Sequence, residues 1–595
     1  MADTKQRQPH AAALRSRWIE SYKPHAGLLM LYLIAGILSA AVVVLSVQLR
    51  TEFIDVVLED SGAKKAILEL LLQNLIVVFG IRFFFPALQS HWESVILQRM
   101  SLKLERQAAE KKCTIAWACH EDAGVQDTME LIKDIPNQMW LYFKGIGDII
   151  SAAVSTAGVF YLMMQLGIAF VAFLFLLLIP VAYCSIRAAT AYYDTWQRTA
   201  KLRRYSDYER DLLMDKEYAT ERILFAYTPF FLRRWERDYQ QVRSLSLQEE
   251  LKGSQQMQIS GIAFCLYIAV LIFVLVHRLE CGQITAGYAV SLISVFPTLA
   301  NQMVITLSSE INQIARARRA IAAWMEFQAL NDEEGAFDLP QQGTDVSEIV
   351  FCGISFRYPN TEKWVLKDIN LRFERGQHYA IVGENGAGKS TLIKLLLGLY
   401  QATEGEILID GININAIPRG QLRGMVTALF QDHQRYYTTV AESIGIGDIH
   451  RVYDRSCIED SAAQAEIHQR IEAMPQGYDT PLGSMHAGGI ELSGGEWQKL
   501  AVSRLIVSPC PVKILDEPTA AMDPMFEYEL YQEFHKIMEG RTTISISHRL
   551  ASCRAADYVY VLDCGSVLEQ GTHEQLMEDG QLYCTMYTTQ RDMYR

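Results

Sequence analysis

Six apolar stretches of about 20 residues dominate the first half of the chain. They cover residues 26–47, 66–88, 139–165, 167–186, 260–277 and 283–307. A helix of about 20 apolar residues is long enough to cross the hydrocarbon core of a bilayer. Six such stretches in succession favour membrane spans over the core helices of a soluble protein. We therefore predict an α-helical six-span transmembrane domain.

The charges between these stretches predict on which side of the membrane each loop lies. The segments after the second and fourth stretches are long, helical in pattern and rich in Lys and Arg, whereas the first loop is short and acidic. The basic residues include Arg99, Lys103, Arg106, Lys111, Lys112, Arg198, Lys201, Arg203 and Arg204. Because cytoplasmic loops carry the excess of Lys and Arg, we expect both long loops and both termini in the cytosol.

Four charged residues, Glu69, Arg82, Lys144 and Asp148, lie within the apolar stretches. Lys144 and Asp148 are four residues apart on one helical face, where they can pair. Charges at membrane depth are costly and usually face a cavity or a partner. Two interpretations stay open: these side chains reach the membrane surface from helix ends, or they line a path for a polar substrate.

After residue 307 the pattern turns polar, and short β-rich runs then alternate with helical patterns, which is typical of an α/β domain. We predict a lead-in at 1–25, a transmembrane domain at 26–330 with two long cytosolic helical loops, a linker at 331–348 and an α/β domain at 349–595. The polar lead-in has no apolar core, so no cleaved signal peptide is expected. Two domains agree with the length of 595 residues.

Composition narrows the classes of function. Half of the residues are hydrophobic and 21% are charged, as expected for a chain that is part membrane protein and part soluble domain. The net charge of −13 gives no support to a nucleic-acid surface. The eleven cysteines are scattered without a C-x-x-C pair, so neither a zinc site nor a disulfide framework is predicted.

A phosphate-binding loop stands between a strand-like run and a helical run. Its glycines let backbone N–H groups surround a phosphate chain, and the following helix adds the favourable end of its dipole. Lys389 is expected to reach the β- and γ-phosphates of ATP, and the Ser390 hydroxyl is expected to bind Mg²⁺. The nucleotide-binding residues predicted here are Gly383, Glu384, Asn385, Gly386, Ala387, Gly388, Lys389, Ser390 and Thr391.

A second motif, Leu492-Ser493-Gly494-Gly495-Glu496, opens a helix ahead of an apolar run that ends in Asp516-Glu517. With both motifs in this order after six spans, the chain resembles an ATP-binding-cassette (ABC) transporter of the exporter type. The resemblance implies a P-loop ATPase domain that hydrolyses ATP with Mg²⁺ to drive transport. One departure is Lys513, which interrupts the apolar run before Asp516; we expect its ammonium to reach solvent at the start of the strand.

The resemblance implies a role for each matching side chain in catalysis. Glu517 would be the base that activates the attacking water, and His548 would contact the γ-phosphate. Gln431 would touch both Mg²⁺ and the water. Asp516 would orient Mg²⁺ through water, beside the direct ligand Ser390.

The resemblance also implies a dimer. Tyr358 would stack on the adenine of the chain's own ATP, whereas Ser493, Gly494 and Gly495 would close over the γ-phosphate of ATP held by a second cassette. Asp523 lies in a loop that would cross to that partner. The chain has one cassette, so a second chain is needed; a homodimer is the simplest assembly and a heterodimer remains open.

The cargo is less well defined by the sequence. The region around the second motif, with Trp497 after it, is similar to a bacterial subfamily that includes exporters of lantibiotics and other modified peptides. This favours export of a peptide across the bacterial inner membrane. A multidrug or lipid exporter is the alternative, followed by an ATP-gated channel or regulatory ATPase. Residues 118–126 and 216–224 resemble the coupling helices that rest on the cassettes.

Overall fold

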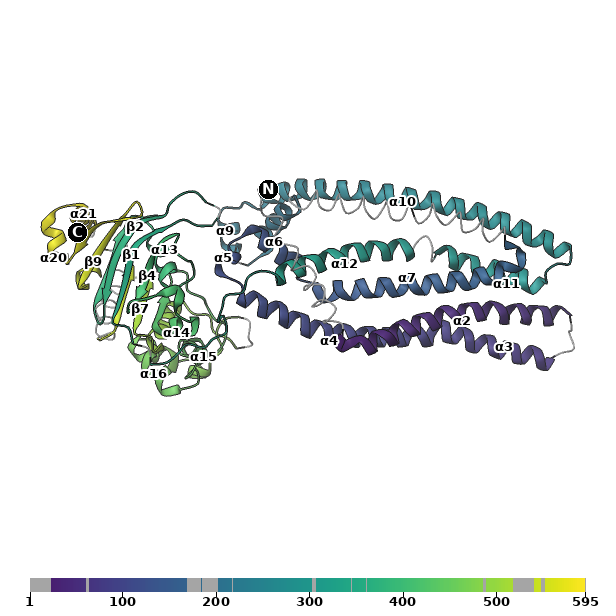
Figure 1. Cartoon of the computed structure of the whole chain (residues 1–595), viewed down its shortest axis with the longest axis horizontal. Helices are drawn as coiled ribbons and strands as arrows, with labels where there is room; N and C mark the ends of the chain where they lie inside the picture. The colour runs from purple at the N-terminus through teal and green to yellow at the C-terminus, as the bar shows by residue number, and fades with distance from the viewer. Residues whose placement is uncertain are drawn as a thin grey trace. The chain divides into compact units, whose positions relative to one another are not determined.

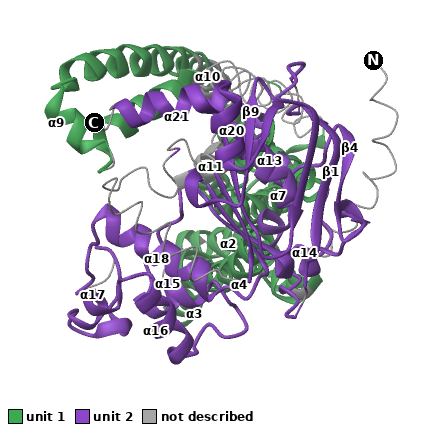
Figure 2. Ribbon diagram, turned by 90° about the vertical axis from the view of Figure 1, so that its left-hand side faces the viewer, with its two compact units in different colours: residues 1–109, 124–330 green, residues 110–123, 331–595 purple. Residues whose placement is uncertain are grey.

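The computed structural model divides into two compact units, which are coloured separately in Figure 2. Unit 1 comprises residues 1–109 and 124–330, and unit 2 comprises residues 110–123 and 331–595. The structure describes residues 23–59, 64–168, 183, 202–216, 218–301, 306–343, 345–359, 361–484, 488–516, 540–546, 550 and 552–593.

Unit 1 is built from long helices. α2 packs against α3, α7 and α11, and α7 also packs against α12; Figure 1 shows these helices running along one another. The bounds are α2 Ala26–Glu59, α3 Lys64–Phe79, a π-helical turn Gly80–Phe84, α4 Phe85–Thr114, α6 Ala123–Leu131, α7 Ile135–Met163, α9 Ala219–Leu224, α10 Thr228–Glu280, α11 Ala286–Asn301 and α12 Leu307–Gln328.

Three helices in the described part of unit 1 are long and apolar enough to cross a membrane. They are Ala26–Leu58, Lys64–Thr114 and Ile135–Met163. They contain the first two predicted spans and all of the third except its last two residues. The fourth predicted span falls almost wholly outside the described residues. The fifth lies within α10, and the sixth is divided between α11 and the start of α12.

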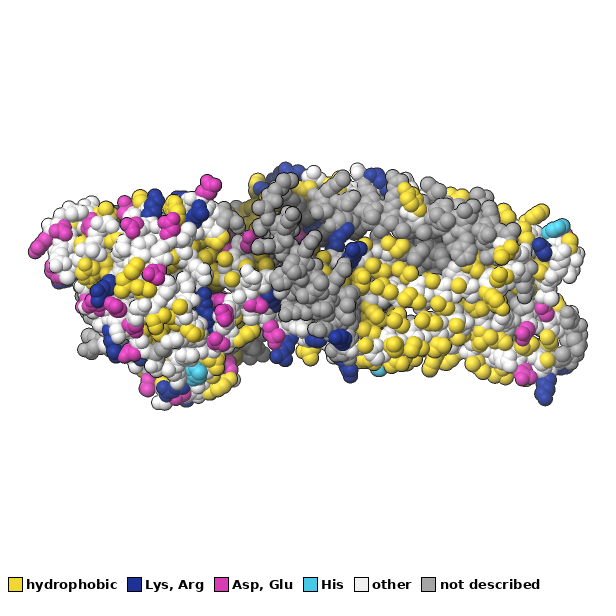
Figure 3. Space-filling model, viewed as in Figure 1, with side chains coloured by type: hydrophobic (Ala, Val, Ile, Leu, Met, Phe, Trp, Pro, Cys, Tyr) yellow, Lys and Arg dark blue, Asp and Glu magenta, His cyan; other side chains and the backbone are white. Residues whose placement is uncertain are grey.

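The outer surface of these helices is apolar. No residue of α3 is buried, and its large side chains are exposed, as Figure 3 shows for the hydrophobic surface over α2 and α3. The exposed residues of α3 include Leu68, Leu71, Leu72, Leu75, Ile76, Val78 and Phe79. A continuous apolar surface of this kind marks contact with lipid or protein rather than with water.

Unit 2 contains two sheets. Four strands form one antiparallel sheet in the order β2-β1-β4-β5, and six form another in the order β10-β9-β3-β8-β7-β6. In the second sheet the strands from β9 to β6 are parallel and only β10 is antiparallel. The bounds are β1 Glu348–Phe356, β2 Leu366–Glu374, β3 His378–Gly383, β4 Glu404–Ile409, β5 Ile412–Asn413, β6 Val426–Leu429, β7 Val512–Asp516, β8 Thr542–Ile546, β9 Tyr558–Asp563 and β10 Ser566–Gly571.

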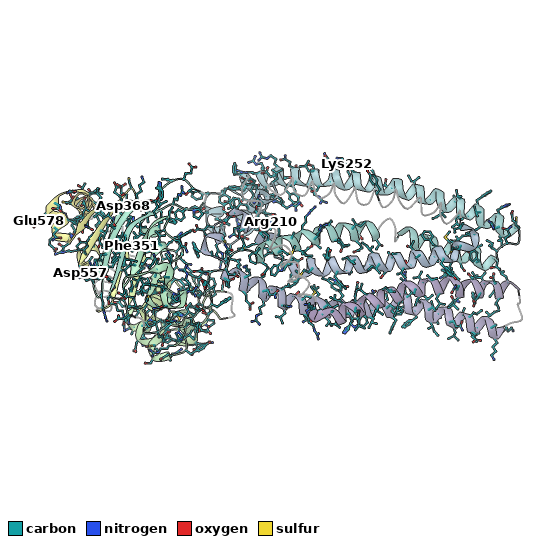
Figure 4. All side chains as sticks on the ribbon, in the orientation of Figure 1. Arg210, Lys252, Phe351, Asp368, Asp557 and Glu578 are labelled. Atoms are coloured by element: carbon teal, nitrogen blue, oxygen red, sulfur yellow. The ribbon has the colours of Figure 1, made fainter. Side chains whose placement is uncertain are left out.

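The two sheets share one core, and a second core lies among helices. Phe351 of β1, labelled in Figure 4, packs edge-on against Phe373 of β2 at 6.0 Å between ring centroids. The helical core includes Trp497 and Leu500 of α18. The helices are α5 Trp117–His120, α13 Lys389–Leu396, α14 Arg419–Met425, α15 Val440–Gly445, α16 Arg455–Gln464, α17 His468–Glu472, α18 Gly494–Val507, α20 His573–Asp579 and α21 Leu582–Met593.

Lys513 does not reach solvent, contrary to the expectation from the sequence. It lies in β7 with 0% exposure. Its Nζ donates hydrogen bonds to the carbonyl oxygens of Leu505 (2.6 Å), Ile506 (3.1 Å) and Ser508 (2.9 Å). These carbonyls end α18, where helical acceptors lack partners within the helix. Burial, followed by the charge of Arg541, lowers the pKa of Lys513. Lys513 therefore ties the end of α18 to the strand that leads to Asp516.

Candidate ATP-binding site

The phosphate-binding loop lies between β3 and α13. Every residue of β3 is buried between β8 and β9, so the loop begins from a fixed strand. A Cβ at Gly383 would lie 2.1 Å from the carbonyl oxygen of Leu562, a distance that no side chain tolerates. Gly388 precedes α13 with a φ of 101°, which favours glycine over other residues. The structure thus places the predicted loop in its expected strand–loop–helix setting.

Lys389 is held over this loop. Its side chain is 6% exposed, and Nζ donates to the carbonyl oxygens of Gly383 (2.8 Å) and Glu384 (3.0 Å). The ammonium is therefore already positioned on the loop that would surround the phosphates. An anion that entered this loop would meet a fixed positive charge together with the N-terminal end of α13.

Three predicted metal-site residues come together here. The Ser390 hydroxyl, at the start of α13, lies 3.5 Å from Oδ1 of Asp516, at the end of β7. Gln431 follows β6, which pairs with β7, and lines a cavity of about 860 Å³ with both residues. Hydroxyl, carboxylate and amide oxygens are the donors that Mg²⁺ prefers. The donor set therefore fits the magnesium of a bound Mg·ATP.

Tyr358 lies between β1 and α13. Its phenol oxygen is 2.9 Å from the Thr391 hydroxyl oxygen, and its ring packs edge-on against Phe356 and Tyr400. The Lys394 ammonium lies 5.8 Å from the centre of the Tyr358 ring. The ring also lines a cavity of about 760 Å³. These contacts with Phe356, Tyr400 and Thr391 hold the ring near the start of α13, where a purine could stack on it.

Ser493, Gly494 and Gly495 begin α18. The Ser493 side chain accepts from the Glu496 N–H, and Glu496 Oε2 accepts from the Ser493 N–H at 2.8 Å, which is a capping box. Arg470 donates to the other Glu496 oxygen at 2.6 Å. Burial opposes ionisation of Glu496, but the hydrogen bonds from Ser493 and Arg470 outweigh it and lower its pKa. Ser493 and Gly494 are exposed, so this helix end is available to a partner.

Glu517, Asp523 and His548 lie outside the described residues. The last described residue of the strand before Glu517 is Asp516, which is 5% exposed. The roles assigned to these three side chains remain predictions from the sequence.

Arg504 of α18 is a positioning residue that the motifs do not reveal. Its Nε donates to the Ser443 carbonyl at 2.9 Å, and its guanidinium lies 4.5 Å from the centre of the Tyr436 ring. Burial lowers the pKa of Arg504, against the opposing effect of Tyr436. Tyr436 lies five residues after Gln431, the predicted Mg²⁺ contact. Arg504 therefore links the segment that follows Gln431 to α18, the helix that begins after Ser493.

Residues 110–123 belong to unit 2, and they form part of the first segment that resembles a coupling helix. Glu121 accepts hydrogen bonds from Tyr400 and from Lys394, the latter at 3.3 Å. The Tyr400 hydrogen bond lowers the pKa of Glu121, and burial followed by Glu121 raises the pKa of Tyr400. Lys111 forms an ion pair with Asp332 at 2.8 Å. Tyr400 therefore contacts both Glu121 of residues 110–123 and Tyr358.

Comparison with known proteins defines the class. Residues 366–520 match the ABC transporter family model, so this segment is similar to the ATP-binding domain of an ABC transporter. The matched segment contains the phosphate-binding loop, the motif that begins at Leu492, and the predicted metal-site residues Gln431 and Asp516.

The full length matches a solved fold. The structure titled "Structure of a bacterial Atm1-family ABC exporter with ATP bound" superimposes with a TM-score of 0.81 at 21% sequence identity, covering 96% of this chain and 99% of that chain. The chain therefore has the Atm1-type ABC exporter fold, an N-terminal helical region followed by an α/β cassette. This confirms the predicted fold class.

Two curated relatives are informative. The chain is 35% identical over 325 residues to the subtilin transport ATP-binding protein SpaT of Bacillus subtilis, covering 55% of this chain and 53% of that protein. It is 29% identical over 388 residues to the ATP-dependent lipid A-core flippase of Bordetella avium, covering 64% and 62%. The matched regions thus span less than two thirds of the length of these relatives.

Proposed function

We propose that the chain is an ATP-driven exporter of the bacterial inner membrane, one half of a dimer in which two cassettes enclose two ATP molecules. The observation that carries this proposal is the convergence of Lys389, Ser390, Gln431 and Asp516 in the unit that accompanies an apolar helical unit. A phosphate site and a metal site in one unit, together with apolar helices in the other unit of the same chain, fit ATP hydrolysis coupled to movement across a membrane.

Hydrolysis would use the side chains as follows. Lys389 neutralises charge on the β- and γ-phosphates, and Tyr358 positions the base. Mg²⁺, held by Ser390 with Gln431 and Asp516, would supply charge neutralisation at the transferred phosphoryl group. Glu517 accepts the proton of the attacking water, and His548 holds the γ-phosphate.

A dimer is required because α18 presents an anion-binding end that its own loop does not use. Ser493 and Gly494 are exposed, whereas Lys389 already lies on a phosphate loop of the same chain. A second chain in head-to-tail orientation would bring its ATP to this helix end, and Asp523 would cross in the same interface. A homodimer needs no further component; a heterodimer would place a related chain in the second position.

Peptide is the cargo class we favour. The similarity to the subtilin transport protein, 35% over 325 residues, supports it. Lipid is the second candidate, supported by the similarity to the lipid A-core flippase over a longer region. A multidrug exporter, an ATP-gated channel or a regulatory membrane ATPase would share the same ATP site and differ only in what crosses the membrane.

The test is transport by the purified chain in inverted vesicles. ATP-dependent accumulation of a fluorescent peptide, absent in the Glu517→Gln variant, is expected for a peptide exporter. Accumulation of a labelled lipid in the opposite leaflet without peptide uptake would support the lipid candidate. ATP hydrolysis with ion flux but no accumulation of either probe would contradict export and indicate a channel.

A further inference from the structure

Lys144 forms an ion pair with a residue of another helix, although its spacing from Asp148 would also allow those two side chains to pair. Its Nζ lies 3.0 Å from Oε1 of Glu93 on α4, and Nε1 of Trp140 donates to the same carboxylate oxygen at 2.8 Å. The ammonium of Lys144 is therefore directed at Glu93.

Two further carboxylates of unit 1, those of Asp148 and Glu310, lie near this pair. Asp148 interacts electrostatically with Glu310, Lys144 and Glu93, and no hydrogen bond or ion pair to its carboxylate is found within the described part of the chain. Glu310 of α12 is only 7% exposed. Its Oε1 accepts from Ser309 at 3.3 Å and Gln313 at 3.5 Å, whereas its buried Oε2 has no hydrogen-bond partner there.

Glu310 is directed at the same face of α7. A Cβ added to Gly145 would lie 3.3 Å from Oε2 of Glu310. Gly145 precedes Asp148 by three residues, a spacing that puts the two positions on neighbouring parts of the helix surface. The unpartnered oxygen therefore lies against the part of α7 that adjoins Asp148. Four charged groups from three helices thus meet at one place, and three of them are acidic.

Aromatic rings border this cluster on the side of α2. Tyr32 is 4% exposed and packs edge-on against Trp140, with 5.1 Å between ring centroids. Aromatic rings together with carboxylates are the surroundings that bind organic cations, such as an ammonium or a guanidinium group. A metal is less suited, because the described residues contain no group of three His, Cys, Asp or Glu side chains that could hold one.

We propose that Glu93, Asp148 and Glu310, with Lys144, form a site for a cationic group of the transported compound, such as an arginine or lysine side chain of a peptide. A buried carboxylate oxygen without a partner is costly, and such groups within membrane helices usually serve a ligand or path. A cationic group from the cargo would give Oε2 of Glu310 its missing donor. The assignment rests on the proposed export function and narrows its substrate class.

The experiment measures peptide binding to the full chain in lipid nanodiscs. One probe is an amphipathic peptide rich in arginine, and the other is the same peptide with every arginine replaced by citrulline, which keeps the shape and removes the charge. We expect the arginine peptide to bind about tenfold tighter or more, and the Glu310→Gln and Asp148→Asn variants to lose this preference. Glu326→Gln, the same change at an exposed position of α12, should retain it.

Equal affinity for the two peptides in the wild type, or an unchanged preference in Glu310→Gln, would overturn the proposal. Glu310→Asp distinguishes loss of the charge from a folding defect. This variant keeps the charge and should keep part of the preference for the arginine peptide. A small organic cation, tetraphenylphosphonium, distinguishes the cation site from the export function. If this ion binds in a Glu310-dependent manner while peptide uptake into vesicles fails, the site stands and the proposed peptide export does not.

Discussion

The phenol oxygen of Tyr358 lies 2.9 Å from the hydroxyl oxygen of Thr391, two residues after Lys389. This contact joins the end of β1 to the first turn of α13 and holds the aromatic ring beside the phosphate loop. The ring is packed against Phe356 and Tyr400, so its orientation is fixed before any nucleotide arrives. A preformed stacking surface reduces the ordering cost of binding.

Two substitutions of Tyr358 should therefore distinguish the contribution of its ring to ATP binding from that of its hydroxyl. Tyr358→Ala removes the stacking surface, which is worth about 1–3 kcal/mol for a base on an aromatic side chain, so ATP binding should weaken about tenfold or more. Tyr358→Phe keeps the ring and loses only the contact with Thr391, so its affinity should stay within about threefold. Titration with a fluorescent ATP analogue measures both. An equal loss in the two variants would assign the binding to the hydroxyl and not to stacking.

Replacing Glu517 with Gln should stop hydrolysis and leave ATP binding intact. The amide cannot accept the proton of the attacking water, and a general base commonly contributes a factor of about 100 or more. Nucleotide-bound dimers should also accumulate, because closure would no longer be followed by hydrolysis. Steady-state phosphate release and nucleotide binding, measured side by side, check this. Turnover above about a tenth of wild type would remove Glu517 from the role of base.

Local motifs of the ATP site could be predicted from the sequence because their chemistry is carried by neighbouring residues. The glycines before Lys389 and the residues from Ser493 to Glu496 fix the backbone within a few positions, and in the structure each group begins a helix. The meeting of Ser390 with Asp516 followed from family resemblance, because 126 residues separate them. No spacing rule could have given that distance.

The sequence did not reveal partners that are distant along the chain. Lys144 and Asp148 satisfy the helical pairing rule, yet Glu93 on another helix is the closer partner, since a tertiary contact overrides a local one. Lys513 looked like a surface residue at a strand end, but the carbonyls that receive its hydrogen bonds belong to α18. In the same way, a loop of the predicted membrane domain, residues 110–123, forms part of unit 2 through contacts such as that of Glu121 with Lys394.

Replacing Lys513 with Met should destabilise the cassette. The change keeps the length and apolar stem of the side chain but leaves the carbonyls of Leu505, Ile506 and Ser508 without this donor. Each buried polar group that loses its partner costs about 1–3 kcal/mol, which should outweigh the gain from no longer burying an amine. The unfolding midpoint of the full chain in detergent should therefore fall.

Lys499→Met is the matched control for this prediction. Lys499 lies in α18, the helix whose carbonyls Lys513 binds. Its Nζ lies 3.4 Å from Glu466 in a partly exposed pair, a type of contact worth about 0–1 kcal/mol. The midpoint should change little. A Lys513→Met midpoint equal to or above that of wild type would show that the hydrogen bonds to α18 add no net stability.

The composite ATP site can be tested by complementation between two inactive variants. Lys389→Ala removes the ammonium that lies on the phosphate loop, and Ser493→Arg places a bulky side chain at the exposed end of α18. Each homodimer should be inactive, because every site in it contains one lesion. In a mixed dimer of the two, the head-to-tail arrangement puts both lesions into one site and leaves the other intact.

The mixed dimer, isolated through two different affinity tags, should therefore bind ATP tightly at one site and recover measurable hydrolysis, whereas either homodimer recovers none. The control places both substitutions in one chain and pairs it with wild type: head-to-tail assembly then puts one lesion in each site, so this dimer should be inactive. If each chain instead built its whole site from its own residues, the outcomes would reverse, with the first mixed dimer inactive and the control active at one site. Phosphate release from the two mixed dimers decides between these arrangements, because the two dimers contain the same substitutions and differ only in which chain carries them.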